Sequence, residues 1–189
     1  MNKLVCGVAL NDAGYVTNKS VDGVQVRCPF YAKWYTMITR CYNGKKPAYK
    51  DCTVCDEWLT FSNFKSWMES QDWDGKQIDK DIIEPGNNVY CPEFCCFVSR
   101  KLNMLLSAGN KAGGAYLTGV AKHKKGSSVF ESKISIDGKQ IRIGFFDREI
   151  DAHIAWKKAK AKLLIDEANR QLDRRIAYGL MKHAELLNA

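Results

Sequence analysis

The chain has 189 residues, of which 46% are hydrophobic and 26% charged, and it carries a net charge of +8 at pH 7. This length is enough for one large core or two small ones, and we expect two small domains. No run of about 18 apolar residues and no secretion signal occurs, which predicts a cytoplasmic protein without a membrane partner. The positive charge predicts an acidic partner such as a phosphate backbone, although a solvated basic surface would give the same excess.

The first part of the chain predicts a hairpin followed by two helices. Two short β-rich runs, Val5 to Leu10 and Gly23 to Arg27, surround turn-forming residues and are typical of paired strands. Apolar residues then recur at steps of three and four in two segments, which indicates amphipathic helices whose stripes pack in a core. The stripes are Phe30, Trp34, Met37, Ile38 and Cys41, and then Trp58, Phe61, Phe64, Trp67 and Met68.

Residues 78–103 predict a strand, a loop, a second strand and a helix. The first strand carries Asp79 and Lys80, a Pro-Gly-Asn-Asn cluster forms the loop, and Ser99 caps the helix that holds Asn103. This order can place Asp79 and Asn103 opposite one another as oxygen ligands. Such ligands suit a hard divalent cation, so we expect Mg²⁺ or Mn²⁺ if the chain is an enzyme.

Eight cysteines occur without a secretion signal, which favours reduced thiols or metal ligands over disulfides. Cys52, Cys55, Cys91 and Cys95 could supply four thiolates to zinc. The second pair has three residues between its cysteines, whereas a zinc knuckle has two, and neighbours on a strand point to opposite faces. We therefore favour buried thiols, and zinc is the weaker interpretation.

A change of composition marks the C-terminal part. Small and flexible residues at 107–115 predict a linker. Three alternating runs follow at residues 119–125, 129–136 and 140–145, and the Asp-Gly turn between the last two is a strong hairpin signal. They predict a three-stranded antiparallel sheet. A helix beginning after Asp147 would present its alanines to that sheet, with its lysines crowding the remaining faces: Lys157, Lys158, Lys160 and Lys162.

Alternation assigns the two faces of this sheet. The apolar face, which should meet the helix, consists of Phe130, Ile134, Ile136, Ile141, Ile143 and Phe145. The polar face presents Lys133, Ser135, Gln140 and Arg142, and the first strand adds Lys122, His123 and Lys124 from one side or the other. Such a surface can lie in the major groove of double-stranded DNA, where Arg and Gln contact base edges and Lys contacts phosphates.

Residues 24–106 resemble the phage-borne HNH homing-endonuclease-like proteins. The shared motifs are Arg40-Cys41-Tyr42-Asn43, Tyr49-Lys50-Asp51-Cys52, Cys55-Asp56-Glu57-Trp58, Phe61-Ser62-Asn63-Phe64, Asp79-Lys80-Asp81 and Tyr90-Cys91-Pro92-Glu93. The resemblance implies a ββα-metal (His-Me finger) module that hydrolyses DNA, with Asp79 and Asn103 as ion ligands. As a separate hypothesis, Lys80 completes the catalytic set by orienting or deprotonating a water. In the family the general base is a histidine, and Lys80 occupies its position. The middle asparagine also departs, because Phe94 stands near its place while Asn87 and Asn88 lie earlier.

Residues 116–165 resemble the Apetala-type DNA-binding domain, which is known at the end of many phage HNH proteins. The resemblance lies in Gly119-Val120, Phe130, Ile134, Gly138-Lys139, Gly144, Phe146 and the alanines at 152, 155 and 159. It implies DNA contact through Lys122, His123, Lys133, Ser135, Gln140 and Arg142. The second-strand tryptophan of the plant form is missing, which leaves the preferred sequence open.

The sequence thus predicts an α+β protein. Its parts are an HNH-like module at 1–106, a linker at 107–115, an Apetala-type domain at 116–165 and a helix at 166–189 that packs or forms a homodimer. The expected function is that of a metal-dependent DNA endonuclease or nickase directed by the C-terminal sheet. Two alternatives stay open: an HNH scaffold without its base that binds DNA or a host protein, and a structural protein with no nucleic-acid function.

Overall fold

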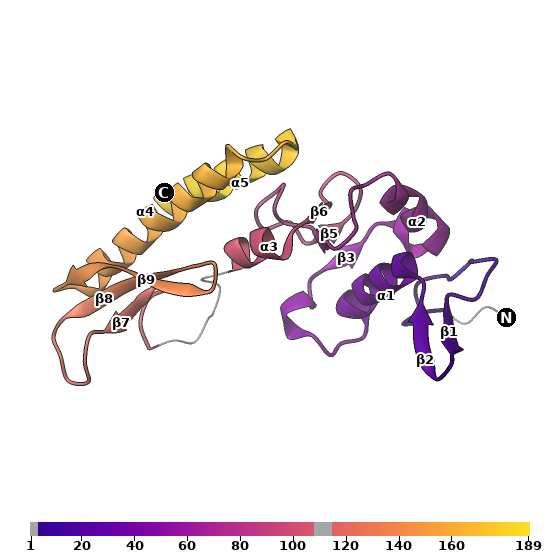
Figure 1. Cartoon of the computed structure of the whole chain (residues 1–189), viewed down its shortest axis with the longest axis horizontal. Helices are drawn as coiled ribbons and strands as arrows, with labels where there is room; N and C mark the ends of the chain where they lie inside the picture. The colour runs from indigo at the N-terminus through magenta and orange to yellow at the C-terminus, as the bar shows by residue number, and fades with distance from the viewer. Residues whose placement is uncertain (1–3, 108–114) are drawn as a thin grey trace. The chain divides into compact units, whose positions relative to one another are not determined.

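The computed structural model describes residues 4–107 and 115–189 (Figure 1). Within these ranges the fold is mixed α and β, with five α-helices and several small sheets, one of them three-stranded and antiparallel. No helix in the described part of the chain is long and apolar enough to cross a membrane.

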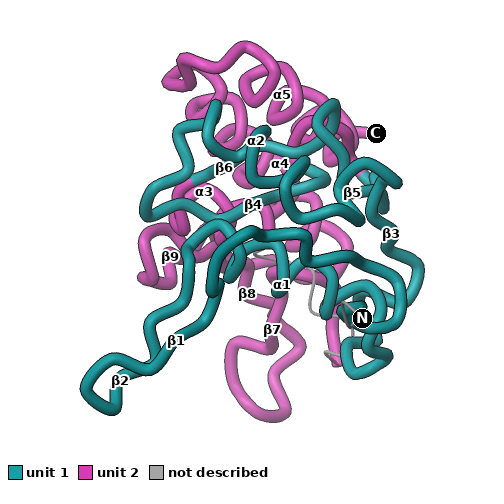
Figure 2. Tube along the Cα trace, turned by 90° about the vertical axis from the view of Figure 1, so that its right-hand side faces the viewer, with its two compact units in different colours: residues 1–81, 86–98 teal, residues 82–85, 99–189 magenta. Residues whose placement is uncertain are grey.

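The chain divides into two compact units (Figure 2). Unit 1 comprises residues 1–81 and 86–98, and unit 2 comprises residues 82–85 and 99–189. The short segment 82–85 therefore leaves unit 1 and belongs to unit 2. Most of the predicted linker at 107–115 lies outside the described residues.

Unit 1 combines two α-helices with three two-stranded sheets. Strands β1 and β2 are antiparallel, β3 and β5 are parallel, and β4 and β6 are antiparallel. The elements are β1 (Asn18–Val21), β2 (Val24–Arg27), α1 (Pro29–Tyr42), η1 (Pro47–Tyr49), β3 (Thr53–Val54), η2 (Asp56–Leu59), α2 (Phe61–Glu69), β4 (Gln77–Asp79), β5 (Val89–Tyr90) and β6 (Cys96–Val98).

The N-terminal hairpin differs from its prediction. β2 pairs with β1, not with residues 5–10, and the two strands are joined by Asp22 and Gly23. Both of these residues have positive φ, 50° and 78°, as a two-residue type I′ turn requires. Residues 5–10 instead form isolated bridges, one within the segment and one to Thr60. Pairing of β2 with β1 is favoured over pairing with residues 5–10, because the two-residue turn directly joins β1 and β2.

The two predicted apolar stripes form the core of unit 1. Trp58 joins them, and its carbonyl accepts a hydrogen bond from Trp34 Nε1 at 2.7 Å. This bond satisfies the indole N–H, which would otherwise be costly to bury. The helix residues buried in this core are Trp34, Met37 and Ile38 of α1, and Phe61, Phe64 and Met68 of α2.

Unit 2 contains the predicted three-stranded antiparallel sheet, in the order β7-β8-β9, and α4 packs against all three strands. Ser132 and Ile134, which share a face of β8, are buried beneath this helix. Helix α5 packs along α4. The elements are α3 (Arg100–Ser107), β7 (Val120–Lys122), β8 (Phe130–Ile136), β9 (Lys139–Phe146), α4 (Glu149–Ala168) and α5 (Arg174–Asn188).

A β-bulge changes the predicted faces of the sheet. Lys133 pairs with Arg142 and Ser132 pairs with Gly144, so Ile143 is an extra residue in β9. Beyond it the alternation of β9 is reversed, and Phe145 pairs with Glu131. The prediction that Phe145 lies on the apolar face is therefore wrong, because strict alternation cannot account for an extra residue.

Helix α5 packs closely on the segment Ile82–Pro85 through Gly179. A Cβ added to this glycine would lie 2.1 Å from the backbone oxygen of Ile82, so no larger residue fits without a shift of the backbone. An ion pair between Lys182 and Glu84 supports the same contact. Helix α5 thus fixes the segment 82–85, which interrupts unit 1 in the sequence and belongs to unit 2.

We expect Gly179→Ala to lower the free energy of unfolding by about 1–3 kcal/mol, because the new methyl group overpacks a backbone contact. In an open helical position the same change would stabilise by up to about 1 kcal/mol. Urea-induced unfolding followed by circular dichroism measures the effect. Gly14→Ala is the control, since nothing lies within 4 Å of its added Cβ. Unchanged or increased stability of Gly179→Ala would contradict the close packing.

Lys160 is buried, although we predicted it on an outer face of its helix. The residue is 4% exposed, and its ammonium donates a hydrogen bond to the carbonyl oxygen of Leu105 near the C-terminus of α3. The unpaired carbonyls at a helix C-terminus attract positive charge, so the contact ties α3 to α4. Burial lowers the pKa of Lys160 from 10.5 to about 8.

This pKa predicts a pH dependence of stability. Between pH 8 and 10.5 the unfolded chain binds more protons at Lys160 than the folded chain, so the free energy of unfolding rises with pH over that window. We expect the free energy of unfolding of the wild type to rise over this window by up to about 3 kcal/mol relative to that of Lys160→Met. Urea unfolding at several pH values measures it, with exposed Lys158→Met as control. If the free energies of unfolding of the wild type and Lys160→Met changed in parallel with pH, the lowered pKa of Lys160 would be contradicted.

Candidate functional site

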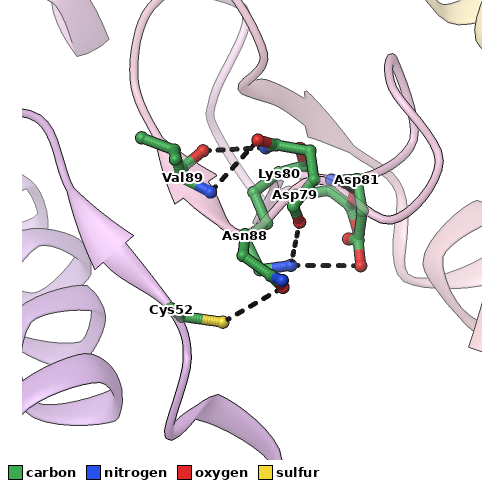
Figure 3. A network of polar contacts seen from close by, with 7 residues as sticks. Cys52, Asp79, Lys80, Asp81, Asn88 and Val89 are labelled. Atoms are coloured by element: carbon green, nitrogen blue, oxygen red, sulfur yellow. Dashed lines mark hydrogen bonds and ion pairs between the residues drawn. The ribbon is translucent and has the colours of Figure 1, made fainter.

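The predicted site residues fall into two groups, one in each unit. In unit 1, β4 ends at Asp79 and is followed by a loop that returns to β5 (Figure 3). Asp79 Oδ1 accepts a hydrogen bond from the backbone N–H of Asp81 at 3.0 Å. This local turn ends the strand and fixes the Asp79 carboxylate at the start of the loop.

The buried side chain of Lys80 connects the two ends of the loop between β4 and β5. The residue is 6% exposed, and its Nζ donates to the carbonyl oxygen of Asn87 at 2.6 Å and to Asp81 Oδ2 at 3.2 Å (Figure 3). A buried ammonium is stable only when such acceptors surround it. These contacts favour a structural function for Lys80, because its donors already bind the two ends of the loop.

Asn87 is a second side chain that holds this loop in place, and no function was predicted for it. Its Nδ2 donates to the carbonyl oxygens of Lys80 at 2.6 Å and Val89 at 2.8 Å, and its Oδ1 accepts from the N–H of Val89 at 3.1 Å. One amide side chain thus satisfies three backbone groups of the loop. The sequence signal that could have predicted this function is the turn rich in glycine and asparagine between two strands.

The predicted ion ligands belong to different units. Asp79 lies at the end of β4 in unit 1, and Asn103 lies in α3 of unit 2. The predicted cap of α3 is confirmed, since Ser99 Oγ accepts from the N–H of Leu102 at 3.2 Å. Among the described residues no group of three or more His, Cys, Asp or Glu could hold a metal ion. A shared Mg²⁺ or Mn²⁺ at Asp79 and Asn103 stays a prediction.

The four candidate zinc ligands are buried or half-buried thiols. Cys52 Sγ donates to Asn88 Oδ1 at 3.8 Å (Figure 3). Burial raises the pKa of Cys52, Cys55, Cys91 and Cys95, which favours the protonated thiol over the thiolate that zinc requires. Buried protonated thiols of this kind contribute to packing, and zinc at these four cysteines stays the weaker prediction.

In unit 2 the strand register brings together four of the seven predicted DNA-contacting residues. Lys133 pairs with Arg142 and Ser135 pairs with Gln140. Cross-strand partners point to the same face, as do residues two positions apart on one strand. The Lys133 and Arg142 side chains are 41% and 58% exposed. They share the face of the sheet opposite to the buried Ile134.

The first strand divides the other three residues. The His123 ring meets Phe145 edge to face, with 4.6 Å between ring centroids, so His123 joins the exposed face. Lys122 instead pairs with Phe130, and its Nζ lies 3.5 Å from the centroid of that ring, on the opposite face. Lys124 lies exposed in the turn between β7 and β8. We call the surface of the sheet opposite to Ile134 the sheet face; it comprises His123, Glu131, Lys133, Ser135, Gln140, Arg142 and Phe145.

Glu131 and Phe145 are members of the sheet face that the sequence analysis did not assign to it. Glu131 Oε2 accepts from Lys133 Nζ at 2.6 Å, and Oε1 accepts from Arg142 Nε at 2.5 Å. These bonds, the one from Lys133 foremost, hold the pKa of the Glu131 carboxyl below its usual range. Alternation alone places Glu131 beside Lys133, so the sequence contained the signal for it, whereas Phe145 depended on the bulge.

Comparison of the chain with protein-family models, with curated proteins and with solved structures finds no match. The basis for assigning a function is therefore the chemistry of the two groups of residues described above.

Proposed function

We propose that the protein binds double-stranded DNA through the sheet face. The observation that carries this proposal is the alignment of Lys133, Arg142 and Gln140 on one exposed face of a sheet whose other face is covered by α4. Arg and Gln pair with base edges in the major groove, and Lys pairs with phosphates. The net charge of +8 favours the same polyanionic partner.

The dimensions of the sheet also suit this partner. Three strands at about 4.8 Å spacing span about 10 Å, and the major groove is about 12 Å wide. The resemblance of residues 116–165 to the Apetala-type domain supports the same surface.

Arg142→Ala is expected to weaken binding to a 20-base-pair duplex by about 5- to 150-fold, the value of one charged or bidentate contact. Lys133→Ala is expected to make the salt dependence shallower by about 0.9 in log K against log [salt], because one phosphate contact is lost. Fluorescence anisotropy between 50 and 200 mM KCl measures both. Arg174→Ala, an exposed change on α5, is the matched control.

An equal loss in the Arg174→Ala control would show that binding depends only on overall charge. Binding by the wild type that does not change with salt would instead favour a structural or host-interaction protein. Thermal unfolding of each variant verifies that the fold is intact.

A second candidate function, which we propose on a separate observation, is metal-dependent cleavage of DNA. The chain has the order β4, loop, β5, β6, α3, with β4 and β6 antiparallel, a carboxylate at the end of β4 and an amide in α3. Asp79 and Asn103 would supply oxygen ligands, and a divalent ion held there would stabilise negative charge on a scissile phosphate. Because Lys80 already donates hydrogen bonds to Asn87 and Asp81, this second candidate function has no assigned base to activate water.

The second candidate predicts that the wild type nicks supercoiled plasmid with Mg²⁺ or Mn²⁺ and not with a chelator. Asp79→Ala should remove nicking and retain DNA binding, because the sheet face lies in the other unit. Agarose gels of the nicked product and anisotropy of the same variant measure the two activities. Equal cleavage by Lys80→Ala would exclude Lys80 as the base. Binding without cleavage by the wild type would leave the chain as a DNA-binding protein that has lost the chemistry.

A further inference from the structure

We propose that Glu131 is a positioning residue of the sheet face, which fixes Arg142 for a two-point contact with a guanine base and cancels one positive charge. The inference rests on the proposed DNA binding and deepens it. Its consequence is that the sheet face favours contacts that depend on base sequence over contacts with the phosphate backbone alone.

The position of Glu131 needs an explanation, because a carboxylate on a surface that meets DNA repels phosphate. The Glu131 side chain is only 4% exposed and lies on the central strand beneath Lys133 and Arg142. Each of its two oxygens accepts a bond from one of these cations, at 2.6 and 2.5 Å. The two flexible cationic side chains are therefore ordered before any ligand arrives, which lowers the entropy lost on binding.

Arg142 is held from two directions. Its Nε donates to Glu131, and its guanidinium carbon lies 4.9 Å from the centroid of the Phe145 ring. Phe145 is itself supported by the edge-to-face contact with His123. The terminal nitrogens Nη1 and Nη2 take no part in the bond to Glu131. Two donors in a planar fork match the N7 and O6 acceptors that guanine presents in the major groove.

The charge of the cluster gives a second consequence. Glu131, Lys133 and Arg142 together carry +1, whereas the same cluster without the carboxylate would carry +2. Loss of Glu131 leaves the positive charge of Lys133 uncancelled beside the phosphates and releases Arg142 from its fixed orientation. Affinity for any duplex should then rise while preference for guanine falls. A purely structural residue would not move these two quantities in opposite directions.

The test uses the full chain and two labelled 20-base-pair duplexes, one rich in G·C pairs and one of A·T pairs only, with anisotropy measured from 50 to 200 mM KCl. We expect the wild type to prefer the G·C duplex by about tenfold. Glu131→Gln should reduce this preference at least about fivefold, bind the A·T duplex more tightly at low salt and steepen the salt slope by about 0.9. Glu185→Gln, the same charge change at an exposed position of α5, should leave the preference unchanged.

Glu131→Asp separates the two effects, because it keeps the charge and shortens the side chain. It should retain the wild-type salt slope and lose part of the preference for G·C, and it serves as the test if Glu131→Gln does not fold. Equal weakening of both duplexes with an unchanged slope would overturn the proposal, as would a wild type that binds both duplexes equally. A wild type that binds neither duplex would instead reject the proposed DNA binding itself.

Discussion

The register between β8 and β9 is the constraint on which the sheet face depends. The Asp-Gly turn sets Lys133 opposite Arg142, and one extra residue, Ile143, sets Glu131 opposite Phe145, so that acid, cations and aromatic ring share a surface. In a regular ladder Phe145 would turn toward α4 and the guanidinium of Arg142 would lose its neighbouring ring. Bulges recur where a sheet must redirect a side chain, and here the result is a cation held between a carboxylate and an aromatic face.

Three buried charges secure chain segments in different ways. Lys80 joins the ends of a loop through a carbonyl and a carboxylate, Lys160 binds the end of a helix, and Glu131 binds two cations across a strand pair. In each case at least one partner lies seven or more residues away along the chain. Removing one partner would leave a buried charge without compensation, which costs far more free energy than the loss of the attraction alone.

The sequence predicted most of what depends on short-range pattern. Both helical stripes of unit 1, the three C-terminal strands with their Asp-Gly turn, and the cap at Ser99 were found because each is set by neighbouring residues. The wrong prediction for Phe145 depends on a bulge that alternation does not reveal, and two others depend on segments elsewhere in the chain. Nothing near Lys160 indicates that the end of α3 would cover it, and the partner of residues 5–10 was decided by a tighter turn elsewhere. The joint action of Asp79 and Asn103 stays a prediction.

The close contact between Gly179 and Ile82 bears on how such a chain can be inherited. Although the linker predicted at 107–115 suggests a point where two genes could have been fused, the segment 82–85 belongs to the same unit as α5. Recombination at that stretch would separate the glycine from the backbone that it accommodates. The two units are therefore expected to have been selected together, as one evolutionary module rather than as two exchangeable ones.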